Sequence, residues 1–133
     1  MIKLIDILEN KILVPRRSKE ERDKNYQRII RKQIQQYIKD GGKGNLNLEN
    51  TPITSLPDNL EVGGNLHLYD TPLTSLSDNL KVGGSLNLRN SKITSLPNNL
   101  KVGEYLSLVD TPLSKKYSKK QIKKMIEDKG GRV

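Results

Sequence analysis

Residues Leu60–Gly103 read LEVGGNLHLYDTPLTSLSDNLKVGGSLNLRNSKITSLPNNLKVG. The same short words, N-L, V-G-G, L-x-L and T-S-L, return in this stretch at a spacing of twenty residues. A catalytic site is unique in its chain and has no reason to recur, whereas a structural unit copied along an axis produces such a pattern. The stretch therefore indicates a stack of similar units.

Six apolar positions recur in each unit, which is too few to close a hydrophobic core within one unit. Stacking allows neighbouring units to bury one continuous apolar strip. The recurring positions form the columns Leu46, Leu66, Leu86, Leu106; Leu48, Leu68, Leu88, Leu108; Ile53, Leu73, Ile93, Leu113; Leu56, Leu76, Leu96; Leu60, Leu80, Leu100; and Val62, Val82, Val102.

Each L-x-L alternates, which predicts a short strand whose two leucines share one face. A helix is not expected in the rest of the unit, because Pro57 and Pro97 interrupt it and too few residues remain for a helical crossover. We expect parallel strands, one per unit, and a return leg that is extended or a tight 3₁₀ turn. The pairs Gly63-Gly64 and Gly83-Gly84 are expected to adopt positive φ in a sharp bend.

The units resemble the short leucine-rich repeats of bacteria and phages, which read L-x-L-x-x-T-x-I-T-S-L-P-x-x-L-x-V-G-G. The resemblance covers Asn45 to Leu113, as three full copies and a truncated fourth. It implies an α+β solenoid, a short leucine-rich-repeat stack with parallel strands that is capped by helices at both ends. Similar bacterial effectors carry a cysteine ligase domain, but this chain has no cysteine. The sequence departs from the general pattern at Gly63, Gly83 and Gly103, and by hydroxyl residues at Thr51, Thr71, Ser91 and Thr111.

Charge divides the chain into three segments. Residues 1–44, a predicted N-terminal helical cap, hold 12 basic and 6 acidic side chains. Residues 45–113, the repeats, hold 4 and 7, and residues 114–133, a predicted C-terminal helical cap, hold 8 and 2. The total of +9 is therefore concentrated in the two caps, and the repeats are mildly acidic.

Both caps show the start and stop signals of helices. Ser18 begins a capping box, an apolar pattern at helical spacing follows it, and Gly41-Gly42 ends the pattern. A short first helix is expected to precede it, at Leu4, Ile5, Ile7 and Leu8. Ser118 begins a second capping box, and a small apolar face made of Ile122, Met125 and Ile126 follows it before Gly130-Gly131. The main N-terminal pattern consists of Tyr26, Ile29, Ile30, Ile34, Tyr37 and Ile38.

No residue pattern predicts catalysis. His67 is the only histidine, and a metal site or acid–base pair would need partners that the composition does not offer. Glu49, Asp70 and Asp110 lie near strand ends, where turns favour acidic and amide side chains. The V-G-G words lack the lysine and the following helix of a phosphate-binding loop. We expect a protein that is not an enzyme and has neither cofactor nor metal.

The outward strand positions vary while the apolar scaffold stays constant, as in a recognition surface. We predict that this face binds a protein partner. A face of four short strands covers only about 300 Å², against about 800 Å² per partner in a standard interface. A tight partner must therefore also touch a flank. The residues predicted to bind are His67, Tyr69, Asn87, Arg89 and Tyr105.

The basic caps support two alternative functions. They can bind a nucleic acid or ribonucleoprotein, as in an inhibitor of a bacterial defence nuclease, or the chain can be a structural virion protein. The start of the chain lacks the apolar core of a secretory signal, and no stretch is long enough to span a membrane. We expect a bacterial or phage protein in the cytoplasm of the bacterium or infected host, with a virion location left open. The basic residues are Arg16, Arg17, Arg22, Lys115, Lys116, Lys119, Lys120 and Lys123.

Overall fold

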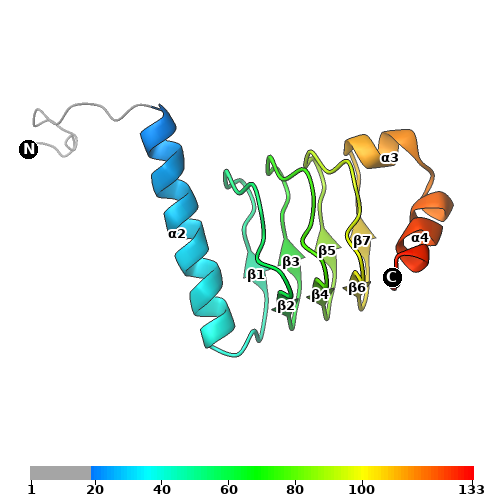
Figure 1. The fold of residues 1–133 in the computed structure, drawn as a ribbon, viewed down its shortest axis with the longest axis horizontal. Helices are drawn as coiled ribbons and strands as arrows, with labels where there is room; N and C mark the ends of the chain where they lie inside the picture. Colours follow the sequence, from blue (N-terminus) through cyan, green and yellow to red (C-terminus); the bar gives the residue numbers. More distant parts are fainter. Residues whose placement is uncertain (1–18) are drawn as a thin grey trace, which may run out of the picture.

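The structure is a computed structural model that describes residues 19–133, with side chains from residue 21 onward. Within this range a long helix, α2 (Lys19–Lys39), precedes a series of two-residue strands, and two shorter helices, α3 (Pro112–Lys116) and α4 (Lys119–Asp128), follow them (Figure 1). The expected first helix at residues 4–8 and the capping box at Ser18 lie outside the described residues. The strands are β1 (Leu46–Asn47), β2 (Glu61–Val62), β3 (Leu66–His67), β4 (Lys81–Val82), β5 (Leu86–Asn87), β6 (Lys101–Val102) and β7 (Leu106–Ser107).

The strands form two parallel sheets, in the orders β1-β3-β5-β7 and β2-β4-β6. Strand partners are twenty residues apart, as in Leu66 with Leu86 and Val62 with Val82. The predicted parallel strands and their register are confirmed, because each repeat adds one strand to the first sheet. The return leg is extended and contributes the second sheet, and the whole is a repeat-like α+β arrangement.

The repeated apolar side chains form the core. Leu66, Leu68, Leu86 and Leu88 are fully buried in the two middle repeats. The side chain of Leu106 in the last repeat is only partly buried. Burial of aliphatic surface stabilises the fold by about 25 cal/mol per Å². The leucines of the two middle repeats are therefore more completely buried than Leu106 in the last repeat.

Left-handed turns occur at two asparagine or aspartate positions of each repeat. Asp70 follows a strand with φ 57°, and Asn79 has φ 63° later in the same repeat. Short polar side chains tolerate this conformation better than other non-glycine residues. The Nδ2 group of Asn79 donates to Oδ1 of Asn59 (2.7 Å), and Nδ2 of Asn99 donates to Oδ1 of Asn79 (2.9 Å). The turn residues thus also link successive repeats.

The glycines of the V-G-G words do not have positive φ, so the expectation of a left-handed bend at Gly63-Gly64 and Gly83-Gly84 is wrong. They are required by close packing between repeats. A Cβ at Gly83 would lie 2.5 Å from the carbonyl oxygen of Gly63, and one at Gly64 would lie 2.5 Å from Oδ1 of Asn45. Any side chain at these positions would push neighbouring repeats apart.

The hydroxyl groups of Thr51, Thr71, Ser91 and Thr111 donate hydrogen bonds to the backbone of their own repeats. The Oγ1 of Thr71 donates to the carbonyl oxygen of Leu68 at 2.8 Å, and the Oγ of Ser91 donates to that of Leu88 at 2.7 Å. Both hydroxyl residues are buried. Their hydrogen bonds satisfy carbonyl groups where the chain leaves the strand.

Thr71→Val should lower the free energy of unfolding by about 1–2 kcal/mol, because it keeps the shape but removes the buried donor to Leu68. Urea denaturation followed by circular dichroism measures this loss. Thr71→Ser is the matched control, since serine serves in the same column at residue 91. If Thr71→Ser and Thr71→Val lower the free energy of unfolding equally, the hydroxyl group does not stabilise the turn.

The helix α2 covers the first repeat with part of its predicted apolar stripe. Ile30 and Ile34 are buried and Tyr37 packs against the core. Tyr26 and Ile29 are exposed, which contradicts a single buried stripe. The predicted apolar stripe is wider than the surface of the first repeat. Only the side chains at the centre of the stripe therefore pack against that repeat. The helix ends before Gly41 and Gly42, with φ 102° and 65°, as predicted.

The C-terminal cap contains more structure than the sequence predicted. Ser118 caps α4 in the expected capping box, and Ile122 and Ile126 are buried on its inner face. The unpredicted helix α3 is capped by Thr111. After α4 the chain returns to β6, where the N–H of Val102 donates to the carbonyl oxygen of Arg132 at 2.9 Å. The tail thus extends the second sheet by one bridge.

Candidate partner-binding surface

The open face of the first sheet carries the predicted partner-binding residues in adjacent repeats. His67 and Asn87 are register partners on β3 and β5, and both are partly exposed. Tyr69 and Arg89 follow the same two strands, and the N–H of Asp70 donates to the carbonyl oxygen of Arg89 at 3.1 Å. The parallel register therefore places these four side chains in two neighbouring columns.

Tyr105 marks the end of this face in the last repeat. Its side chain is 79% exposed, and Val109 on the same strand segment is 50% exposed. Tyrosine is among the side chains that contribute most to protein interfaces when they become buried. Val109 stands in the column of Tyr69 and Arg89 but was not among the predicted binding residues. Its position in the repeat was the signal that could have found it.

Some outward positions serve the scaffold. Oδ1 of Asn45 accepts from the N–H of Asn65, and Oδ1 of Asn65 accepts from the N–H of Ser85, both at 2.8 Å. These two asparagines therefore link neighbouring repeats. Oδ1 of Asn87 accepts from the N–H of Arg89 at 3.0 Å. Asn87 thus shapes the strand end that presents Arg89.

Helix α2 and the helices α3 and α4, which carry the described basic residues, lie at opposite ends of the row of strands (Figure 1). Arg22 is exposed on α2, whereas Arg16 and Arg17 lie outside the described residues. The lysines of the C-terminal cap are exposed on α3 and α4, and Nζ of Lys116 lies 5.5 Å from the centre of the Tyr117 ring. These cap lysines are Lys115, Lys116, Lys119, Lys120 and Lys123.

Asp70 and Asp110, two of the carboxylates near the strand ends, occupy turns. Asp70 accepts a hydrogen bond from the amide of Asn90, and Asp110 occupies a left-handed turn position. Over residues 19–133, no three His, Cys, Asp or Glu side chains come together as a metal site. The arrangement offers polar and aromatic contacts on an open face.

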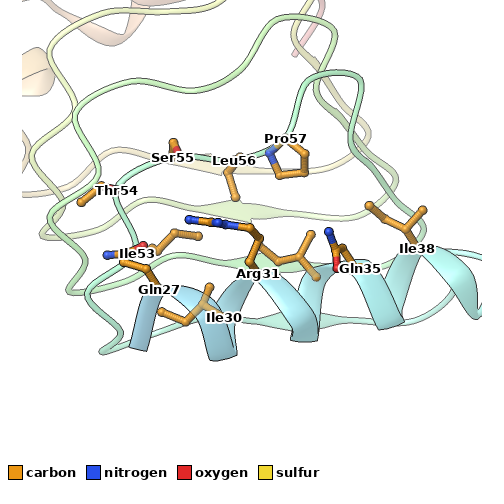
Figure 2. A pocket seen from close by; sticks show the side chains of 11 residues that line it. Gln27, Ile30, Arg31, Gln35, Ile38, Ile53, Thr54, Ser55, Leu56 and Pro57 are labelled. Carbon is orange, nitrogen blue, oxygen red and sulfur yellow. The ribbon is translucent and has the colours of Figure 1, made fainter. Parts of the chain in front are cut away.

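A separate pocket lies between α2 and the return leg of the first repeat (Figure 2). Its volume is about 320 Å³, and Ile30, Ile38, Ile53 and Leu56 contribute apolar groups. Arg31 lies across it between the helix and the return leg. This pocket, which lies between segments distant in the sequence, was not predicted.

In the described part of the chain, no helix is long and apolar enough to cross a membrane. Comparison of the chain with models of protein families, with curated proteins and with solved structures gives no match.

Proposed function

We propose that the chain is a short leucine-rich-repeat solenoid that binds another protein through the open face of its first sheet, without catalysis. The observation that supports it is the contrast between the two faces of that sheet. The inner leucines are buried and constant, while the outer positions of the same strands carry His67, Tyr69, Arg89 and Tyr105. We place this bacterial or phage protein in the cytoplasm of the bacterium or infected host and leave a virion role open.

The area of the face limits the proposal. Strands about 4.8 Å apart make a four-stranded face roughly 15–19 Å wide, or about 300 Å². A standard partner buries about 800 Å². The partner must therefore extend beyond the strands, and the exposed Tyr105 and Val109 direct it toward the last repeat.

The double variant Tyr69→Ala, Arg89→Glu should reduce recovery of the partner at least about tenfold, because interface tyrosines and arginines often contribute about 2 kcal/mol or more. Affinity capture from the source cell, with quantification by mass spectrometry, measures this loss. The matched control is Tyr26→Ala, Lys92→Glu, which also truncates one exposed tyrosine and reverses one exposed positive charge, at positions outside the strands of this sheet. Equal recovery with the two variants would contradict the proposal.

Nucleic-acid binding is the second candidate, favoured by the exposed lysines of the C-terminal cap. Binding to phosphates weakens steeply as salt rises, because counterions are released. Capture should therefore be repeated after nuclease treatment and at several salt concentrations. A protein that stays bound after nuclease treatment supports the first function, and complete loss of captured protein supports the second.

A further inference from the structure

Within residues 19–133, the chain covers three of the four outer edges of its two sheets. At β1, Nε2 of Gln33 on α2 donates to the carbonyl oxygen of Asn47 at 3.3 Å. Beside β2, the N–H of Gly63 donates to the turn after α2 at 2.8 Å. At β6, the C-terminal tail accepts from Val102 through Arg132. The fourth edge is β7, the last strand of the first sheet.

The edge of β7 presents backbone donors that earlier repeats use. The amides of Leu86 and Leu88 donate to the next repeat at 2.8 and 2.9 Å. The equivalent amides of Leu106 and Leu108 have no hydrogen-bond partner in the part of the chain that the structure describes. Leu106 is also less buried than its counterparts in the middle repeats. The ladder therefore ends in unpaired donors beside the exposed Tyr105.

Unpaired strand edges accept extended segments, whose backbone continues the ladder. The charge of the chain segment that follows β7 indicates the kind of segment that this edge would bind, although Glu104 and Asp110 beside the strand are acidic. Residues 114–133, which follow β7, carry 8 basic and 2 acidic side chains. A second copy of the chain would bring an identical cationic cap to this edge, and the two caps would repel each other. An acidic segment would be attracted.

We propose that β7 accepts an extended acidic segment of the protein partner as an added strand. This inference rests on the proposed protein-binding function and deepens it, because it extends the interface from the open face to a flank. Carbonyl groups of the segment accept from the amides of Leu106 and Leu108. Its acidic side chains lie near the lysines of α3 and α4.

Amide hydrogen exchange measured by NMR tests this edge directly. The probe is the peptide acetyl-Glu-Val-Glu-Val-Glu-Val-Glu-amide, and its control replaces each glutamate with lysine. In the free protein, the amides of Leu106 and Leu108 should exchange at least about tenfold faster than those of Leu86 and Leu88, which are paired. The glutamate peptide should slow the two edge amides, and the lysine peptide should not.

Three results would overturn the proposal. They are slow exchange at Leu106 and Leu108 in the free protein, equal protection by the two peptides, and no protection by the glutamate peptide. Protection that rises with protein concentration in the absence of peptide would also reject it, because a second copy would then occupy the edge.

A pair of variants separates the backbone from the side chain. Leu106→Pro and Leu106→Ala both remove the leucine side chain, but only proline also removes the edge N–H. Proline is tolerated where the N–H of an edge strand faces outward. The proline variant should bind the glutamate peptide at least about tenfold more weakly than the alanine variant. Equal affinities would overturn the strand-addition mode.

The same peptide separates this inference from the proposed function. Tyr69 and Arg89 belong to the second and third repeats. In the variant Tyr69→Ala, Arg89→Glu, the glutamate peptide should therefore still slow amide exchange at Leu106 and Leu108. Loss of partner capture in that variant, with edge protection retained, supports both proposals. If partner capture is unchanged and the peptide still slows exchange at the edge amides, only binding through the open face is rejected. If capture is reduced and the peptide does not slow this exchange, only the added strand is rejected.

Discussion

Leu86→Ala is expected to lower the free energy of unfolding by about 2–5 kcal/mol, as is typical of buried leucines. Leu86 is fully buried, and its strand pairs with a neighbour on each side, at Leu66 and Leu106. Because repeats pack on both sides of Leu86, its truncation leaves a cavity that the surroundings fill only in part. Small domains are stable by only about 5–15 kcal/mol. Circular dichroism during thermal and urea denaturation should show a clear loss.

Leu106→Ala is the matched control for this variant. It makes the same change in the same column, but Leu106 is partly exposed in the last repeat. The loss should be smaller, because less apolar surface leaves the core. An unchanged midpoint for Leu86→Ala, or equal losses at residues 86 and 106, would contradict the gradient of burial along the stack.

Gly83→Ala is expected to cost about 3 kcal/mol, at the upper end of the range for overpacking. The added methyl group would meet backbone, with the carbonyl oxygen of Gly63 at 2.5 Å and its carbonyl carbon at 3.2 Å. Backbone cannot rotate away as a side chain can. The repeats must separate, which weakens the 2.7 Å hydrogen bond from the N–H of Gly83 to Val62. Urea denaturation and amide exchange at residue 83 measure both effects.

Gly44→Ala separates this clash from a general effect of losing a glycine. A Cβ at Gly44 meets nothing within 4 Å, although its φ of +81° is costly for alanine by about 1–2 kcal/mol. In the Gly44→Ala variant, the rate of amide exchange at Gly83 should be the same as in the parent protein. A Gly83→Ala protein as stable as the parent would show that the repeats are not held at this close distance.

Periodicity allowed much of the architecture to be predicted. The twenty-residue spacing of leucines predicted the parallel strands, and the register of Leu46, Leu66, Leu86 and Leu106 confirms it. The capping box at Ser118 and the end of α2 at Gly41-Gly42 were also predicted, because these signals act over a few neighbouring residues. The open-face residues were placed in neighbouring columns by the same periodicity.

Other features depended on contacts between distant residues. The packing role of Gly83 was not predicted, because a glycine required by a neighbouring backbone has the same letter as one required by a turn. The exposure of Tyr26 and Ile29 depends on how much surface the first repeat offers to α2. The pocket beside Ile38 has the same origin.

The sequence by itself determined the repeat, its strand register and the charge of its two caps, because periodicity and local capping are written in neighbouring letters. Only the tertiary structure decided which sheet edges are covered. The tail at Arg132 pairs with β6, while the amides of Leu106 and Leu108 at β7 have no partner among residues 19–133. The physical reason is that backbone donors are identical in every residue, so only the positions of distant segments determine which of them find an acceptor.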